Sequence, residues 1–239
     1  MVLTHELSFD SWPGNAILVK LKNLNWTMIA GIVLLSVVWR VQAAPVVSES
    51  TLKKIQKVYG TQASQDVAQW NNLLQTLADQ DIQQQLSEVN NFFNRQKFVD
   101  DIVHWNKEDY WATPIEFIAT GGGDCEDFSI AKYFSLRALG VPANKLRLMY
   151  VNALEYNQAH MVLAYYEQPN VIPLVLDNLN KTILPANQRR DLQPVYSFNG
   201  EGLWAAKEQG RGKQLQNGGN HSLWRDLTSR MNLEKNNEE

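Results

Sequence analysis

The chain has 239 residues, of which 44% are hydrophobic, and its formal net charge at pH 7 is −3. Its basic residues form no cluster or stripe, so nucleic acid is not an expected partner. It has no internal repeats, and its length suits one domain with a substantial core better than two.

The first recognisable segment is an uncharged run of about fourteen residues, Trp26–Trp39. A membrane span needs roughly 20 apolar residues, so this run has the length of a signal-peptide core. Lys20 and Lys22 precede it, and Val41-Gln42-Ala43 supplies the small-residue pattern of a cleavage site. We therefore expect residues 1–44 to export the chain from the cytoplasm.

Two alternatives stay open for this segment. Arg40 closes the run and a long leader precedes it, as in an uncleaved N-terminal anchor, although a start codon placed too early would also explain the leader. Cleavage would leave 19 basic and 23 acidic residues, a net charge of −4. We divide the mature chain into a folded domain, residues 45–207, and a polar C-terminal extension, residues 208–239.

Residues 48 to about 105 have the apolar period of helices. A first helix stops at Gly60, and two further sets repeat apolar residues at three- and four-residue steps. The last set continues through Phe98, Ile102 and Val103, so we expect its helix to extend that far.

An aromatic-rich connection over residues 105–123 leads to a helix that begins at Cys125. This helix is apolar on nearly all sides, which is typical of a helix buried in the middle of a domain. Gly140 and Pro142 end it.

Three strands follow, and Pro173 indicates that the third is an edge strand or begins irregularly. We expect them over Leu146–Val151, His160–Tyr166 and Val171–Asp177, with a short return over residues 181–184. The expected fold class is α+β, with N-terminal helices and a central buried helix carrying the cysteine, packed on an antiparallel sheet.

The only cysteine lies in the run Gly121-Gly122-Gly123-Asp124-Cys125-Glu126-Asp127. This pattern predicts a loop that delivers the thiol to the first turn of a helix, where the backbone N–H groups and the helix dipole stabilise a thiolate. A lone cysteine in an exported chain indicates a reactive thiol, because exported domains usually carry cysteines in pairs or not at all. The alternative is a small buried hydrophobic residue.

His160 and Asp177 follow on predicted strands. Cysteine, histidine and aspartate in this order suggest a thiol nucleophile, its base and the group that orients the base. Asp177 ends an apolar strand, where a carboxylate needs a buried partner. The other histidines lie in the presumed leader, at a helix end and in the polar C-terminal region: His5, His104 and His221.

Three carboxylates, those of Asp124, Glu126 and Asp127, crowd the thiol and oppose its ionisation. Asp124 and Asp127 have the spacing of a helix N-cap and a capping box, which accounts for two of the three. A bound Ca²⁺ accounts for all three, since its charge would cancel the repulsion felt by the thiolate. The spacing is not that of an EF-hand, and both interpretations stay open.

Together these motifs resemble those of the bacterial transglutaminase-like cysteine proteinases, and most of all the LapG-type periplasmic proteases. The likeness covers roughly residues 50–207 and rests on the glycine–cysteine run together with three further segments, Tyr110–Phe117, Ala159–Leu163 and Leu176–Asn178. It implies a papain- or transglutaminase-like fold with a triad of Cys125, His160 and Asp177. It also implies calcium ligands at Asp124, Glu126 and Asp127.

The resemblance further implies a calcium-dependent endopeptidase that cuts a giant surface adhesin near its N terminus, at a di-alanine site. Such cleavage releases the adhesin from the outer membrane and promotes biofilm dispersal. An inner-membrane receptor for cyclic di-GMP would sequester the protease through its periplasmic domain.

Trp111, in the segment that leads to the nucleophile, is our candidate for contact with that receptor, because interface hot spots are enriched in tryptophan. The alternative is a buried lid over the core. Trp105 and Trp204 are the next candidates.

Two other functions use the same residues. A Cys-His-Asp triad can also transfer an acyl group to a lysine amine, or deamidate glutamine. A non-catalytic binding module of the same fold is the second rival, and the intact set of three residues argues against it.

Overall fold

The structure is a computed structural model that describes residues 46–205, 214–216 and 222–236. The expected signal peptide, residues 1–44, and its cleavage site lie outside these ranges. Within them, no helix has both the length and the apolar character that crossing a membrane requires.

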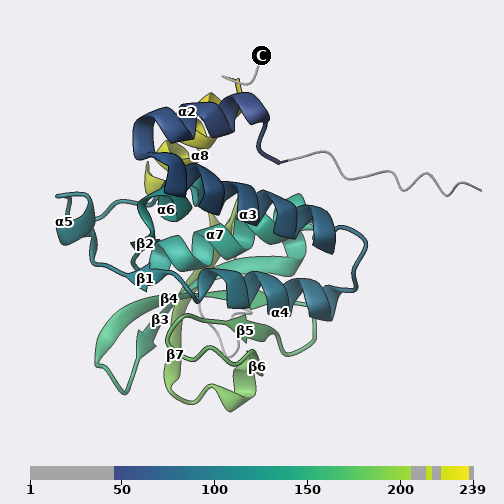
Figure 1. Ribbon diagram of the computed structural model, residues 1–239. Coiled ribbons are helices and arrows are strands. Elements are labelled where there is room, and N and C mark those ends of the chain that lie inside the picture. Colours follow the sequence, from purple (N-terminus) through teal and green to yellow (C-terminus); the bar gives the residue numbers. More distant parts are fainter. Residues whose placement is uncertain (1–45, 206–213, 217–221, 237–239) are drawn as a thin grey trace, which may run out of the picture. The chain divides into compact units, whose positions relative to one another are not determined.

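The described residues form helices packed on an antiparallel sheet (Figure 1), so the predicted α+β class is confirmed. The sheet has the strand order β6-β5-β4-β3-β7-β8-β9. Its strands are β3 (Leu146–Ala153), β4 (Gln158–Tyr165), β5 (Leu174–Leu176), β6 (Leu184–Pro185), β7 (Leu192–Asn199), β8 (Gly202–Ala205) and β9 (Gln214–Gln216). A separate parallel pair joins β1 (Lys97–Phe98) to β2 (Gly122–Gly123).

The helices follow the predicted order along the chain, with three that were not predicted as separate elements, over Asp101–His104, Pro114–Thr120 and Ser222–Asn236. They are α2 (Glu49–Tyr59), α3 (Thr61–Leu77), α4 (Ile82–Phe93), α5 (Asp101–His104), α6 (Pro114–Thr120), α7 (Cys125–Ala138) and α8 (Ser222–Asn236). Short 3-10 turns cover Ala143–Lys145 and Ala186–Gln188.

The third helix is shorter than predicted. It ends at Phe93, and Phe98 instead pairs in parallel with Gly123. Ile102 and Val103 fall in the short helix α5 and are 58% and 75% exposed. The helical spacing of apolar residues therefore continues in the sequence beyond the end of the helix, because pairing with the glycine loop changes the direction of the chain.

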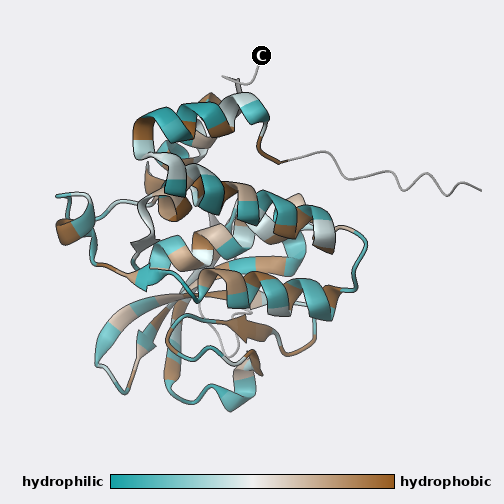
Figure 2. Cartoon of the chain, viewed as in Figure 1, coloured by the Kyte–Doolittle hydropathy of each residue, from teal (hydrophilic) through white to brown (hydrophobic). Residues whose placement is uncertain are grey.

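Helix α7 is buried between the other helices and the sheet, as its composition predicted. Its Ile130, Ala131 and Leu136 are fully buried, and Trp70 of α3 donates a hydrogen bond to Ser135 Oγ at 2.9 Å. Hydrophobic residues of α7 are brown in Figure 2, where they lie between the helical layer and the sheet. The helix that carries the cysteine is thus fixed on nearly every side.

The predicted strands are present, with shifted ends. β5 begins directly after Pro173, but it lies inside the sheet because β6 pairs with its outer side. β7 and β8 were not predicted. The C-terminal extension was expected only to be polar, yet α8 buries Trp224 and Leu227 in the core.

The prediction that Trp111 contacts a receptor is wrong. Its side chain is 1% exposed and stacks on Phe198 with ring centroids 5.5 Å apart. A residue buried to this extent cannot be an exposed anchor for a receptor, so Trp111 is a core residue.

Candidate active site

The glycine run brings the end of α6 into contact with the start of α7. Gly121 ends α6 in the left-handed region, with φ of 79°, which favours glycine. A Cβ on Gly123 would lie 2.1 Å from Oδ2 of Asp127, so only glycine allows this close approach. The loop is therefore pressed against the first turn of α7, where Cys125 is the first helical residue.

The predicted cap of α7 is confirmed. The side chain of Asp124 accepts a hydrogen bond from the backbone N–H of Glu126 at 3.2 Å. In return, the backbone N–H of Asp124 donates to Asp127 Oδ2 at 3.3 Å. This capping box fixes the helix start and with it the position of the thiol.

The thiol of Cys125 lies against the carboxylate of Glu126. Its Sγ donates to Glu126 Oε2 at 2.8 Å, and the Tyr150 hydroxyl donates to the other oxygen at 2.9 Å. Burial raises the pKa of the Cys125 thiol well above its usual value, and the charges of Glu126 and Asp124 raise it further. Without a compensating cation the site therefore disfavours the thiolate.

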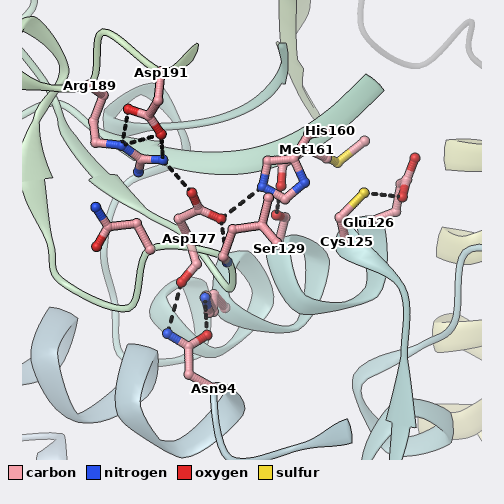
Figure 3. Close-up of polar contacts among 12 residues, drawn as sticks. Asn94, Cys125, Glu126, Ser129, His160, Met161, Asp177, Arg189 and Asp191 are labelled. Atoms are coloured by element: carbon pink, nitrogen blue, oxygen red, sulfur yellow. Dashed lines mark hydrogen bonds and ion pairs between the residues drawn. The ribbon is translucent and has the colours of Figure 1, made fainter. Parts of the chain in front are cut away.

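On the other side of the thiol is the pair of His160 and Asp177, from β4 and the end of β5. His160 Nε2 lies 2.8 Å from Asp177 Oδ1, and both side chains are buried. The second ring nitrogen of His160 faces the sulfur of Cys125 (Figure 3). Ser129, one turn along α7, donates to the carbonyl of Met161 at 2.9 Å and so sets the helix against this strand.

Cys125 and His160 line one open cavity of 420 Å³. Its other lining residues come from the β1–α5 region, the start of α7 and the loops around β4 and β5: Phe98, Asp100, Asp124, Glu126, Gln158, Ala159 and Leu179. The partly exposed thiol and the buried imidazole thus both border this cavity.

Asp177 is held by several donors besides His160. Its Oδ1 also accepts from the N–H of Leu179 at 2.9 Å, and its Oδ2 accepts from Arg189 Nη2 at 2.6 Å. Burial alone would raise the pKa of Asp177, but the contacts with His160 and Arg189 hold it well below its usual range. Asp177 therefore stays ionised.

A further group of carboxylates lies at the start of α7. Asp101 of α5, Asp124 and Asp127 each contribute an oxygen, and these oxygens lie within 4.8 Å of one another. Asp124 and Asp127 were predicted as metal ligands, but Asp101 was not. Glu126, also predicted, lies outside this group in the structure and contacts the thiol and Tyr150 instead.

This acidic group accepts hydrogen bonds from backbone N–H groups but has no basic side chain among the described residues to balance its charge. Burial raises the pKa of Asp101 to about 6 and shifts those of Asp124 and Asp127 upward as well, with neighbouring carboxylates adding to the effect on each. No ion pair joins the three to a basic side chain in the part of the chain that the structure describes. Asp101 Oδ1 is buried without a hydrogen-bond partner.

The donor set fits a hard cation. Three carboxylates offer only oxygen ligands, which Ca²⁺ prefers. Asp101 Oδ1, which has no hydrogen-bond partner among the described residues, is available to bind the cation. A divalent charge would remove the mutual repulsion that raises the pKa values of the group.

Comparison with known proteins identifies the family. A family model described as bacterial transglutaminase-like cysteine proteinase, BTLCP, matches residues 56–194. The chain belongs to this family.

Solved structures agree with this assignment. LapG from Legionella pneumophila treated with EGTA is 44% identical with a TM-score of 0.67, and the match covers 79% of this chain and all of that one. Calcium-bound LapG from the same organism is 45% identical with a TM-score of 0.65, over 75% of this chain and 98% of that one. A search of curated proteins found no match.

This transglutaminase-like cysteine proteinase thus holds Cys125 and His160 at one cavity, with Asp177 directly behind the imidazole. The sequence singled out all three from their order and their surroundings. Their individual roles in catalysis are part of the function proposed below.

Other residues of the site were missed by the sequence analysis. Asp101 was placed in the tail of a helix, and the adjacent acids Asp100 and Asp101 were the only signal for it. Arg189 and Tyr150 contact site residues through tertiary packing that no local pattern indicates.

Proposed function

We propose that this cysteine proteinase is a calcium-dependent endopeptidase of the periplasm that cuts a giant surface adhesin near its N terminus. The observation that carries the proposal is the arrangement at the start of α7, where a thiol and a His–Asp pair lie near three crowded carboxylates. Similarity to LapG structures, one calcium-bound and one EGTA-treated, supports both the protease and the metal.

In the proposed reaction Cys125 is the nucleophile and His160 the base. His160 takes the thiol proton, and the sulfur attacks the carbonyl carbon of the scissile peptide bond to form a tetrahedral oxyanion. The backbone N–H of Cys125, at the helix start, would contribute to stabilising that oxyanion. The imidazolium then protonates the amine, which leaves as the C–N bond breaks, and a thioester remains.

Hydrolysis of the thioester completes the cycle. His160 removes a proton from a water molecule, the hydroxide attacks the thioester carbonyl, and the proton passes back to the departing sulfur. Asp177 holds the imidazole in the tautomer that can accept the thiol proton, because its Oδ1 accepts from Nε2.

Before attack the thiol must turn away from Glu126, which contacts it in the structure. Asp101, Asp124 and Asp127 would hold the Ca²⁺, and the predicted ligand Glu126 contacts the thiol. The bound cation supplies positive charge that offsets the carboxylates surrounding the sulfur.

Cleavage would release the adhesin from the outer membrane and so promote biofilm dispersal. Export by the segment 1–44 brings the protease to the periplasm, where an inner-membrane receptor for cyclic di-GMP can sequester it through its periplasmic domain. With Trp111 buried, Trp105 and Trp204 remain the aromatic candidates for that contact, and both are half-buried.

The direct test uses purified mature protein and the N-terminal region of a co-encoded giant adhesin. We expect two fragments in the presence of Ca²⁺ and none after chelation, and N-terminal sequencing should place the cut at a di-alanine site. Crosslinked product, or a mass shift of one dalton per modified glutamine without fragments, would instead favour acyl transfer or deamidation. An uncut adhesin in Ca²⁺ would overturn the proposed substrate.

Cell fractionation tests the proposed location. We expect the mature protein in the periplasmic fraction with an N terminus near residue 45. Recovery of the full-length chain in the inner-membrane fraction would show that the segment is an uncleaved anchor.

A further inference from the structure

Arg189 is a buried basic residue for which the proposed mechanism has no use. It lies between a 3-10 turn and β7 and is only 3% exposed. Its Nη2 donates to Asp177 Oδ2 at 2.6 Å and to Asp191 Oδ2 at 2.7 Å, while its Nε donates to Asp191 Oδ1 at 2.9 Å. Figure 3 shows the guanidinium between the two carboxylates.

The contacts divide the Asp177 carboxylate into two halves. Oδ1 accepts from His160 and from the N–H of Leu179, whereas Oδ2 accepts from Arg189. A carboxylate held by donors on both oxygens cannot rotate about its Cβ–Cγ bond without breaking a hydrogen bond. Arg189 thereby fixes, together with the donors on Oδ1, which way the carboxylate faces.

The backbone of Asp177 is held by other residues. Its carbonyl accepts from Asn94 Nδ2 at 2.8 Å, and Asn94 Oδ1 accepts from Lys132 Nζ at 2.7 Å. Lys132 belongs to α7, the helix that begins at Cys125. Loss of Arg189 would therefore free the carboxylate while this second link still holds the main chain.

Burying Arg189 leaves a polar group unsatisfied. Among the described residues its Nη1 has no hydrogen-bond partner although it is buried, and such groups are unfavourable in a protein interior. The neighbouring Arg190 is exposed. Arg189 thus pairs with both carboxylates at the expense of one unpartnered nitrogen.

We propose that Arg189 is a positioning residue for the proteinase reaction, which fixes the carboxylate of Asp177 and, through it, the tautomer and orientation of His160. The inference rests on the proposed triad. With Oδ1 held toward the ring, Nε2 carries the proton and the second nitrogen is free to accept the proton of Cys125. Without Arg189 the carboxylate can turn, and the imidazole loses this bias.

The test compares Arg189→Met with Arg190→Met, which removes an equal charge from the adjacent exposed position. Both are made in the calcium-loaded mature protein, and kcat and KM are measured on the adhesin fragment. Nitrogen-15 NMR of the histidine rings gives the tautomer of His160, assigned by comparison with His160→Gln. This second readout needs no substrate, so it stays informative if the adhesin is not cut.

We expect Arg189→Met to lower kcat at least tenfold with KM changed less than threefold, and to lose the Nε2-protonated signal of His160. Arg190→Met should leave both within twofold. In Arg189→Ala, millimolar guanidinium should restore part of kcat, because the ion can occupy the vacated space.

Three results would overturn the proposal. One is a folded Arg189→Met enzyme with kcat within threefold of wild type. Another is a tenfold loss of kcat with an unchanged His160 spectrum, since the effect would then not pass through the imidazole. If Arg189→Met does not fold, Arg189→Lys is measured in the same way, and failure of both to fold would make Arg189 a purely structural residue.

Discussion

The active site has two sets of acids, Asp177 alone and the group of Asp101, Asp124 and Asp127, and they are held in opposite ways. Asp177 is 1% exposed and accepts hydrogen bonds from His160, Leu179 and Arg189. Asp101 and Asp127 are as deeply buried, at 5% and 0%, yet share no ion pair with a basic side chain among the described residues. The pKa of Asp177 is lowered, whereas those of the acidic group are raised.

The difference separates what the protein supplies from what it must acquire. The His–Asp pair has its counter-charge built in, in the form of Arg189. The acidic group has carboxylate ligands but no cation, so an external one completes it. The triad geometry should therefore be independent of metal, and the thiol beside the acidic group should depend on it.

The largest expected effect comes from the triad itself. Cys125→Ala, Cys125→Ser and His160→Ala should abolish cleavage of the adhesin fragment, a loss of at least about 10³-fold, because each removes a bond-making group. Asp177→Asn should lose the same or less, since it only orients the base. Calorimetry should show unchanged Ca²⁺ binding in Cys125→Ala, as the two sets are separate.

Near-normal cleavage by Cys125→Ala would contradict the thiol mechanism outright. Melting temperatures close to that of wild type serve as the control for folding.

Removal of calcium should have the next largest effect. A chelator should suppress cleavage, and Ca²⁺ should restore it better than Mg²⁺, whose strict octahedral geometry suits an irregular carboxylate group less well. At a free concentration 100 times its dissociation constant, Ca²⁺ should stabilise the fold by about 2.7 kcal/mol, measured by urea denaturation. Equal activity and stability with and without chelator would mean that the carboxylates cap the helix and bind no metal.

Changes of single carboxylates separate the residues that bind Ca²⁺ from the residue that contacts the thiol. Asp101→Asn and Glu126→Gln should each weaken Ca²⁺ binding. The loss for Asp101→Asn should be at least about tenfold, because it removes a ligand from the group of Asp101, Asp124 and Asp127. At saturating Ca²⁺, only Glu126→Gln should change the rate at which iodoacetamide alkylates Cys125, since Glu126 contacts the thiol. Glu108→Gln, at an exposed position between α5 and α6, is the control.

If Asp101→Asn altered the alkylation rate as much as Glu126→Gln did, the acidic group would affect the thiol as directly as Glu126 does.

The smallest effect concerns Lys132, the second buried cation on the Asp177 side. Burial lowers its pKa to about 7, and the charge of Asp177 opposes part of the shift. Between pH 7 and 10.5 the unfolded chain binds a proton that the native protein does not, so Lys132 disfavours the fold increasingly as pH falls toward 7. Each pKa unit corresponds to about 1.4 kcal/mol.

The free energy of unfolding of Lys132→Met relative to wild type should therefore be higher at pH 7 than at pH 10, by more than about 1 kcal/mol, when both are measured by urea unfolding. Lys53→Met, at an exposed position of α2, should show no such trend. A pH-independent difference for Lys132→Met would mean that the lysine is charged in the native protein at both pH values.

How far the sequence could predict this site depends on the range of the interactions. The glycine loop, the cap of α7 and the buried helix follow from neighbouring residues, so local rules were sufficient for them. His160 and Asp177 were found because an isolated polar residue on an apolar strand is conspicuous.

Asp101 was missed for a different reason. Pairing of Phe98 with Gly123 brings α5 next to the start of α7, and this contact overrides the helical period that the sequence carries through the segment. Arg189 likewise reaches Asp177 from an irregular connection. Trp111 shows the converse error, since its local surroundings fit a loop anchor while stacking on Phe198 of β7 buries it.

The most direct test of the comparison is a calorimetric titration of Ca²⁺ into the mature protein, with Asp101→Asn and Asp177→Asn measured alongside. We expect one binding site in wild type, an affinity within threefold of wild type in Asp177→Asn, and a loss of at least tenfold in Asp101→Asn. No binding to wild type, or equal binding to wild type and Asp101→Asn, would contradict the claim that the acidic group is completed by an external cation.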